Sequence, residues 1–378
     1  MMQTPAGRET GRSPDRPVCG PAGVHTGMDV TEAADQRAAV SGAKSDLIAR
    51  ARAGDGDAFR KLTDPHSREL RVHCYRMLGS LQDAEDALQD TLLMAWQGLE
   101  GFEERASLRT WLYRIATNRC LNVLRSAARR AAKEWDVPGV DRPEPTRLGE
   151  VVWLDPFPDA LFDDAIDVEL GPDARYEQNE SISLAFVTAL QVLPPRQVAV
   201  VILRDVLGFH ATEVAEMLDA TVESVNSALK RARASLRHRR SPIGARDSLP
   251  ITDSLSEDAM VAKFVTAYEA ADLDTIVALL TDDVFLSMPP MPFEYEGRDV
   301  VSRFCRAIFG AGRRFDLLRT RANGQPAFGT YLRTSSGVSK GVGLIVLEVI
   351  GDRISAMSRF EHHVLPWFGL PASVPSEK

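Results

Sequence analysis

The sequence predicts a multidomain protein with two all-α modules followed by an α+β domain. A chain of 378 residues is longer than an ordinary single domain. Apolar residues recur with helical spacing through most of the first 240 positions, whereas strand-like segments begin only after residue 280. Charge is also segregated along the chain, which indicates modules with separate tasks.

The first 44 residues are rich in Gly, Pro, Thr and Ala and lack the apolar core of a signal peptide. We therefore expect a disordered extension at 1–44, within which Met28 is an alternative start. No apolar run is long enough to cross a membrane. Four scattered cysteines do not resemble a zinc site or a disulfide framework. These features predict a cytoplasmic protein with no metal, no cofactor and no membrane partner.

Residues 45–133 are expected to form the first helical module, with three or four helices separated near Gly54–Asp57, Gly79–Ser80 and Gly98–Glu104. One of these helices has an apolar stripe that should face a core: Leu81, Ala84, Leu88, Leu92, Ala95 and Leu99. Its other face is acidic and amide-rich: Asp83, Glu85, Asp86, Gln89 and Asp90.

The next helix, expected over Leu108–Arg125, is amphipathic with a cationic face. Every charged residue from Arg105 to Lys133 is basic. The formal net charge of −8 would alone disfavour a nucleic-acid partner, but this local concentration of positive charge favours one.

An acidic, Pro-rich linker is expected at 134–179; from Glu134 to Glu180, acidic residues outnumber basic ones by fourteen to three. Its segment Trp153–Pro158 is too aromatic for a neutral spacer, so we expect it to dock on another part of the protein.

Residues 180–240 are expected to form the second helical module, in which Pro194 and Pro195 suit a helix start. Two short helices, Thr212–Leu218 and Val222–Arg237, are separated by a three-residue turn, which matches a helix-turn-helix. The second helix ends in a basic run: Lys230, Arg231, Arg233, Arg237, Arg239 and Arg240.

After a linker at 241–254, residues 255–372 should form the α+β domain. A helical segment is expected over Asp258–Leu280. Four segments have strand character: Val284–Met288, Phe328–Arg333, Gly343–Ile350 and Arg353–Arg359.

The second module closely resembles domain 4 of the extracytoplasmic-function (ECF) sigma factors of the sigma-70 family, on Leu193–Val198, Glu213–Leu218 and Ser224–Arg233. The first module resembles domain 2 of the same family on Asp83–Asp90 and Leu108–Asn118. The two occur in the family's order and without a domain 3. The resemblance implies an alternative sigma factor that binds core RNA polymerase through its largest and second-largest subunits, directs it to promoter DNA and is then released. An anti-sigma factor is a further partner that the resemblance allows.

In the family, the acidic helix face of domain 2 docks on the polymerase, which implies core-binding residues here: Asp86, Ala87, Leu88, Gln89 and Asp90. An ordinary solvated helix face is the alternative. The family's next helix opens the promoter, which implies DNA contacts from Trp111, Arg114, Asn118, Arg119, Asn122, Arg125, Arg129 and Arg130. A buried structural role is the alternative for Trp111.

In the helix-turn-helix, residues at the start of the second helix should enter the major groove. The candidates are Thr221, Glu223, Ser224, Asn226, Ser227, Lys230, Arg231 and Arg233. Residues at helical spacing between them should pack inward: Val222, Val225, Leu229, Ala232 and Leu236. His210 departs from the family pattern, because relatives often place a Ser or Thr cap there; we expect Thr212 or the imidazole to cap the helix instead.

The C-terminal domain resembles the SnoaL-like, nuclear-transport-factor-like cone that some sigma factors of this group carry, on Phe264–Leu273, Leu279–Val284, Asn323–Ala327 and Phe368–Pro371. Trp153–Pro158 and Gly171–Pro172 also occur in that group's linker. The resemblance implies a regulatory appendage without catalytic residues. Some stand-alone cones are enzymes, and Asp283, His362 and His363 are the groups here that could act as acids or bases.

Two rival functions stay open on the sequence. A one-component transcription factor with a ligand-sensing cone would explain the C-terminal half but leaves Asp83–Lys133 without a task. A cone-fold enzyme with a nucleic-acid tether is the second rival, and activity of the isolated cone towards a substrate would distinguish it.

Overall fold

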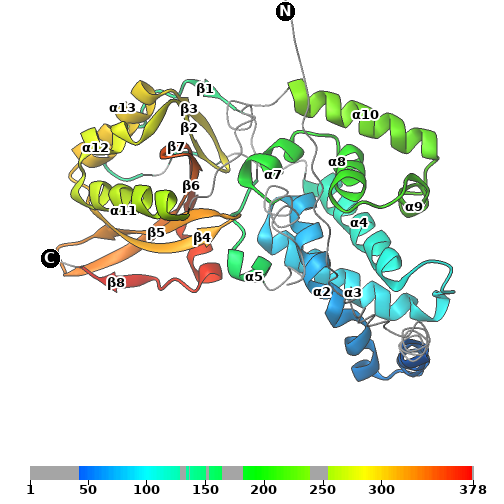
Figure 1. Ribbon diagram of the computed structural model, residues 1–378. Helices are drawn as coiled ribbons and strands as arrows, with labels where there is room; N and C mark the ends of the chain where they lie inside the picture. The colour runs from blue at the N-terminus through cyan, green and yellow to red at the C-terminus, as the bar shows by residue number, and fades with distance from the viewer. Residues whose placement is uncertain are drawn as a thin grey trace, which may run out of the picture.

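The structure, a computed structural model, describes residues 42–127, 133–135, 137–149, 153–163, 182–238 and 254–376. A helical half and a half built around a β-sheet lie side by side (Figure 1). Most of the extension expected at 1–44, together with Arg129 and Arg130, lies outside the described residues.

The first module consists of a helix that includes residues 42–52, α2 (Gly56–Leu78), α3 (Leu81–Gly98), the short 3-10 helix η1 (Leu99–Gly101) and α4 (Leu108–Ala127). The sequence explains the boundary between α2 and α3. Gly79 ends α2 with a φ of 72°, a backbone conformation that glycine adopts without steric cost. The Ser80 side chain then accepts a hydrogen bond from the Asp83 N–H and starts α3.

The apolar stripe predicted on α3 is confirmed, because all of its members are buried except Leu92, which is partly buried. Across this core, Tyr75 of α2 and Tyr113 of α4 are fully buried. Cys74 and Cys120 meet in the same core, and burial raises the pKa of the Cys120 thiol well above its usual value. Such a thiol is protonated and has a structural role.

The second module consists of α7 (Leu184–Gln191), α8 (Pro195–Val201), a π-helical turn η2 (Ile202–Val206), α9 (Ala211–Met217) and α10 (Val222–His238). Pro195 occupies the first turn of α8 as predicted. Asp219 makes the turn between α9 and α10 with a φ of 49°. The expected inward set on α10 is confirmed: Val225, Leu229 and Ala232 are buried, and Val222 and Leu236 are partly buried.

The start of α9 differs from the prediction. The helix begins at Ala211, and the hydrogen bond across its first turn runs from the His210 backbone N–H to the Glu213 carboxylate at 2.8 Å. The Glu213 carboxylate therefore caps the His210 backbone N–H, which is one of the two hydrogen bonds of a capping box. The sequence pattern did not indicate this role of Glu213.

The C-terminal domain contains α11 (Ser254–Ala270), α12 (Leu273–Ala278), α13 (Arg298–Gly310) and the 3-10 helix η3 (His362–Phe368). Its strands are β2 (Leu280–Met288), β3 (Met291–Glu296), β4 (Phe315–Ala322), β5 (Gln325–Arg333), β6 (Val338–Ile350), β7 (Arg353–Glu361) and β8 (Ser373–Pro375). The segment expected to be one helix over Asp258–Leu280 is thus two helices, broken at Ala271, where φ is 53°.

One sheet runs in the order β1-β3-β2-β7-β6-β5-β4, and β8 pairs with β6. Its first strand, β1 (Arg147–Leu148), comes from the linker. The remaining linker helix, α5 (Asp159–Asp163), lies beside β4. Helices α11, α12 and α13 cover one face of the sheet (Figure 1). Apolar side chains of the other face belong to the same continuous core as the helical modules, for example Leu344, Val346 and Phe360. In the part of the chain that the structure describes, no helix is long and apolar enough to span a membrane.

Candidate nucleic-acid interface

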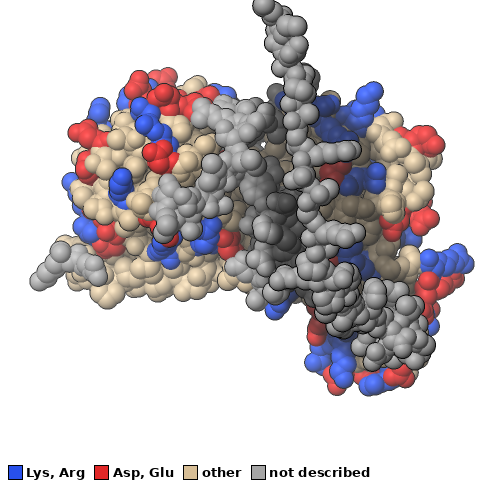
Figure 2. Space-filling model, viewed as in Figure 1, with Lys and Arg blue, Asp and Glu red and all other residues tan. Residues whose placement is uncertain are grey.

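The outer face of α10 is open to solvent and carries the predicted base-reading set. Thr221, Glu223, Ser224, Asn226, Ser227, Lys230 and Arg231 are all exposed. Figure 2 shows basic side chains along the edge of the molecule where α10 lies. Arg233 is exposed too, but its Nε and Nη2 donate to the two oxygens of the Asp205 carboxylate, at 2.9 and 2.6 Å. This bidentate pair holds Arg233 against its own module, so it is less available for DNA than Lys230 and Arg231.

On α4 the predicted residues fall into two groups. Arg114, Asn122 and Arg125 are exposed, and the one side-chain hydrogen bond that they make among the described residues is local, from Arg125 to Asn122. Asn118 donates a hydrogen bond to the Met217 carbonyl of the second module at 3.2 Å. Arg119 forms an ion pair with Asp90 of α3 at 2.6 Å.

Trp111 is half-buried and packs on Phe102, with ring centroids 4.9 Å apart. The alternative of a structural role for this side chain therefore has direct support. Aromatic packing of this kind fixes the loop after η1 against the start of α4.

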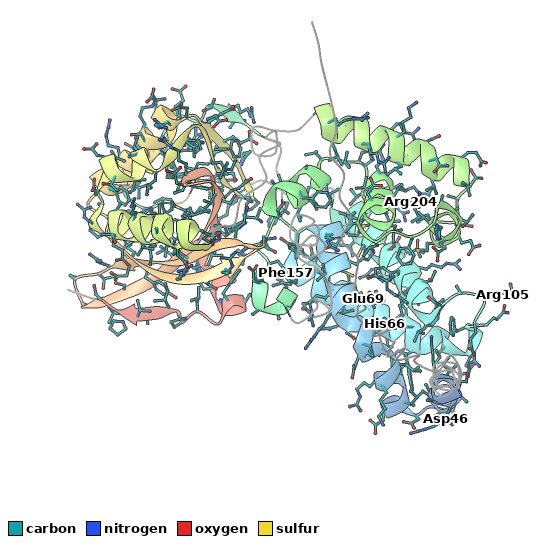
Figure 3. All side chains as sticks on the ribbon, viewed as in Figure 1. Asp46, His66, Glu69, Arg105, Phe157 and Arg204 are labelled. Atoms are coloured by element: carbon teal, nitrogen blue, oxygen red, sulfur yellow. The ribbon has the colours of Figure 1, made fainter. Side chains whose placement is uncertain are left out.

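The second module rests on α4 through Phe209, whose ring lies 5.3 Å from the ring of Tyr113 and 5.1 Å from the Arg109 guanidinium. Arg109 also donates to the Glu69 carboxylate of α2 at 2.8 Å, close to His66 (Figure 3). Burial alone would raise the pKa of Glu69, but hydrogen bonds from His66 and Arg109 outweigh it and lower that pKa. Glu69 is thus an anion that orients Arg109 towards the contact between the modules.

The exposed face of α3 departs from the prediction in two ways. Ala87 and Leu88 are buried, at 0% and 4% exposure, so they cannot touch a partner directly. Leu88 belongs to the apolar stripe, and Ala87 lies next to it on the same side of the helix as Ala84. Leu93 and Met94, which we had not selected, are 54% and 48% exposed. Both lie outside the spacing of the buried stripe, a signal that could have identified them. We call Asp86, Gln89, Asp90, Leu93 and Met94 the α3 face.

The linker and the cone meet the helical modules at one buried junction, around Phe157 and Asn323 (Figure 3 labels Phe157). The Asn323 side chain accepts from the Phe157 N–H at 2.8 Å and donates to the Tyr75 hydroxyl at 3.0 Å and to the Ile182 carbonyl at 2.7 Å. Tyr75 in turn donates to the Asp155 carbonyl at 2.7 Å. One amide therefore joins α2, the linker, the start of the second module and the cone.

The three acid–base candidates do not line the two cavities described for the cone; Asp283 lies in β2 and is half-buried. His362 and His363 are exposed on η3, and the His363 Nε2 lies 3.8 Å from Asp155 of the linker. That contact raises the pKa of His363. None of the described residues that line the cavities of the cone is Asp, Glu or His. Within the described ranges, the side chains form no cluster suited to a metal ion.

Three families match this chain. Residues 62–130 match Sigma-70 region 2, residues 183–236 match Sigma-70, region 4, and residues 261–357 match the SnoaL-like domain. These ranges fall within the first helical module, the second module and the cone, respectively.

The relatives agree with this division. The ECF RNA polymerase sigma factor SigG of Mycobacterium tuberculosis is 41% identical over 327 residues, which cover 84% of this chain and 85% of SigG. SigW of Bacillus subtilis is 26% identical and covers 50% of this chain, with 92% of SigW aligned. The crystal structure of the M. tuberculosis extracytoplasmic function sigma factor SigJ aligns over 81% of this chain and 96% of its own, with a TM-score of 0.53 and 20% identity, and thus shares the three-part fold.

The extent of the match to SigG, together with the order of the two sigma regions and the appended cone, shows that this chain belongs to the ECF sigma factors of the sigma-70 family.

Proposed function

We propose that the protein is an alternative sigma factor, which binds core RNA polymerase in the cytoplasm, directs it to promoters through both helical modules and is released after initiation. The observation that carries this proposal is the exposed polar and basic face of α10 on a helix-turn-helix, in a chain whose α4 presents a second basic face. Two separated nucleic-acid surfaces suit a protein that recognises two promoter elements at once.

The tasks of the two surfaces differ. The N-terminal part of α10 has donors and acceptors that can contact base edges in the major groove, and Lys230 and Arg231 follow as phosphate contacts. On α4, Arg114, Asn122 and Arg125 offer cations and amides suited to a strand that has lost its pairing.

The α3 face supports a protein partner. Exposed Leu93 and Met94 lie beside exposed Asp86 and Gln89, a mixture of apolar and polar groups that is typical of protein–protein contact. We assign this face to the core polymerase. Other members of the family are found with anti-sigma factors, and the same exposed surfaces would be open to such a partner.

The cone regulates this activity by holding the two helical modules together. Its junction at Asn323 contacts both of them, and the residue that meets the second module on α4, Asn118, is itself a DNA-binding candidate. The closed arrangement therefore competes with promoter binding. No catalytic role is proposed, because the acid–base candidates lie outside the cone cavities.

Transcription by core polymerase with and without the full-length protein tests the central proposal, with start sites mapped across genomic DNA. Specific new starts are expected only when the protein is present. Replacing Leu93 and Met94 by serine should weaken co-purification with core polymerase, whereas Gln82→Ala, exposed on the same helix, is the matched control. Absence of specific starts would contradict the proposal. A one-component transcription factor, in contrast, would bind DNA without co-purifying with polymerase.

A further inference from the structure

The cone encloses two adjoining cavities, of about 50 and 30 Å³. Four residues line both of them, and three of these make the walls largely apolar: Tyr268, Phe304 and Ile308. A water molecule needs roughly 10 to 15 Å³ of such space, so the cavities hold a few waters at most. Known ligand pockets are several times larger, about 300 to 1,000 Å³. We call these two adjoining cavities the chamber. In this conformation the chamber is too small to hold an organic ligand.

Two arginines line this chamber: Arg359 lines both cavities, and Arg313 lines the larger one. Arg359 of β7 lines both cavities, on the same side of the strand as the buried Met357. Within the described chain its one hydrogen bond runs from Nη2 to the Val342 carbonyl at 3.3 Å, although a guanidinium has five N–H donors. No carboxylate of the described residues forms an ion pair with it; Glu361, on the same strand, pairs with Lys133 at 2.6 Å. Burial lowers the pKa of Arg359.

A charged group in an apolar enclosure is costly unless a partner of opposite charge satisfies it. The fork of N–H donors on arginine matches the two oxygens of a carboxylate. The chamber thus offers an anchor for an organic acid, surrounded by apolar surface for the rest of the molecule.

Two residues that do not belong to the cone, Trp135 and Val137 of the linker, line the larger cavity. Trp135 of the linker lines the larger cavity, and its indole stands edge-on to Phe304, with ring centroids 6.2 Å apart. Its Nε1 donates to the nearby Val140 carbonyl at 2.9 Å, so the hydrogen bond of the indole is made within the linker. Nothing in these contacts ties the indole to the cone except ring packing.

The linker on either side of Trp135 is held at the rim of the cone by polar contacts. Lys133 pairs with Glu361, and Arg313 donates to the Pro138 carbonyl at 3.4 Å. Farther on, the Tyr295 hydroxyl donates to the Pro143 carbonyl at 3.0 Å. Most of these contacts are solvent-exposed, and exposed contacts contribute little stability. Withdrawal of the indole therefore breaks few strong polar contacts, and it enlarges the chamber.

We propose that the cone binds a small organic acid with a flat apolar body, whose carboxylate pairs with Arg359 and whose body takes the place of the Trp135 indole. The ligand and the linker then compete for one site. Occupation of the chamber releases Lys133, Trp135 and Pro138 from the rim and weakens the attachment of the linker to the cone.

The consequence for transcription rests on the proposed function, but ligand binding does not, and it can be measured without polymerase. A failure of binding would leave the sigma activity standing. Conversely, absence of transcription would leave the binding result unaffected.

Calorimetric titration of the full chain with indole-3-acetate and with the neutral indole-3-acetamide tests the proposal. The acid should bind at least about tenfold more tightly than the amide, because only the acid forms a charge-assisted pair. Trp135→Ala should bind the acid about tenfold more tightly again, since no indole has to leave. Arg359→Met should lose about tenfold in affinity for the acid and leave the amide unchanged.

Two matched variants serve as controls. Trp153→Ala removes an indole from the same linker outside the cone, and Arg306→Met removes an exposed arginine of α13; both should bind like the wild type. If Arg359→Met fails to fold by circular dichroism, Arg359→Lys keeps the charge without the fork and should show a smaller loss for the acid alone. Equal affinities for acid and amide, or no binding of the acid to Trp135→Ala at millimolar concentration, would overturn the proposal.

Discussion

The two basic helices, α4 and α10, differ in how far the rest of the chain engages them. On α10 the predicted reading residues face solvent, and only Arg233 is held by an internal ion pair. On α4, Asn118 is bonded to the second module, Arg119 is paired with α3 and Trp111 packs on Phe102. The DNA-binding candidates on α10 are thus largely open to solvent, whereas several of those on α4 are engaged within the protein. We therefore expect control of this protein to act on α4.

The junction at Asn323 offers the largest change. Asn323→Ala removes three side-chain hydrogen bonds. It leaves the Phe157 N–H of the linker and the Ile182 carbonyl of the second module without this partner, whereas the Tyr75 hydroxyl keeps its hydrogen bond to the Asp155 carbonyl. At roughly 1 to 3 kcal/mol for each unsatisfied group, we expect the closed arrangement to lose about 2 kcal/mol or more. The rate of amide hydrogen exchange along α4 should then rise towards the rate along α10. Gln325→Ala, in the same turn, is the control, and unchanged exchange in Asn323→Ala would contradict the role of the junction.

On α10 the expected effect is on DNA affinity. Replacing both Lys230 and Arg231 by alanine should reduce the slope of log affinity against log salt concentration by about 2, since each phosphate contact contributes roughly 0.9. Promoter binding by the polymerase complex at several salt concentrations measures this. The exposed Lys263 of the cone provides the control substitution. A slope equal to that of the wild type would mean that these two residues do not contact phosphates.

A smaller effect is expected where α3 meets α4. Asp90→Asn breaks the ion pair with Arg119, both of which are partly exposed, so unfolding free energy should change by no more than about 1 kcal/mol. Binding to core polymerase should weaken and binding to single-stranded DNA should strengthen, because Arg119 becomes free. Titration of the variant with each partner, compared with Asp83→Asn at the start of α3, separates these effects. If neither affinity changes, the pair has no part in either interface.

The smallest effect concerns pH. Because contact with Asp155 raises the pKa of His363 in the folded protein, the pair stabilises the linker at low pH and loses this contribution as pH rises through the folded pKa, above the ordinary value of about 6.5. The nearby Glu361 strengthens and Lys133 weakens the effect. Since the imidazole is half-exposed, it should remain below about 1 kcal/mol. His363→Gln should flatten the pH dependence of thermal unfolding between mildly acidic and mildly basic solution; an unaltered profile would exclude this pair as its source.

Sequence patterns predicted what depends on local spacing. The stripe on α3, the boundary at Gly79 and Ser80, and the inward residues of α10 all follow from helical periodicity and capping, and the structure bears them out. Even Leu93 and Met94 could have been found by asking which apolar residues fall outside the stripe. In the cone, the sequence pattern did not indicate β3 and β4, because their exposed and buried positions do not alternate regularly. It also did not indicate α13, although the buried residues Val301, Phe304, Cys305 and Phe309 recur there at helical spacing.

The contacts that define the candidate site could not be predicted in this way. Asn118 and Met217 are 99 residues apart, and Asn323 and Tyr75 are 248 residues apart. Such pairs depend on how the modules pack on one another, and no local sequence pattern indicates that packing. Trp135 shows the same limit. The sequence pattern places it at the start of a linker, whereas its side chain lines a cavity of the cone.

The two-residue strand β1 has a further consequence, for the solution behaviour of the cone. It lies on β3, which would otherwise be the terminal strand of the sheet, and Arg147 covers that edge with ion pairs to Glu294 and Glu296. Unpaired strand edges are templates for pairing with other chains. The linker therefore protects this sheet edge from pairing with other chains. A truncated protein that begins at residue 254 would lack β1, so we expect it to aggregate more readily than the full chain.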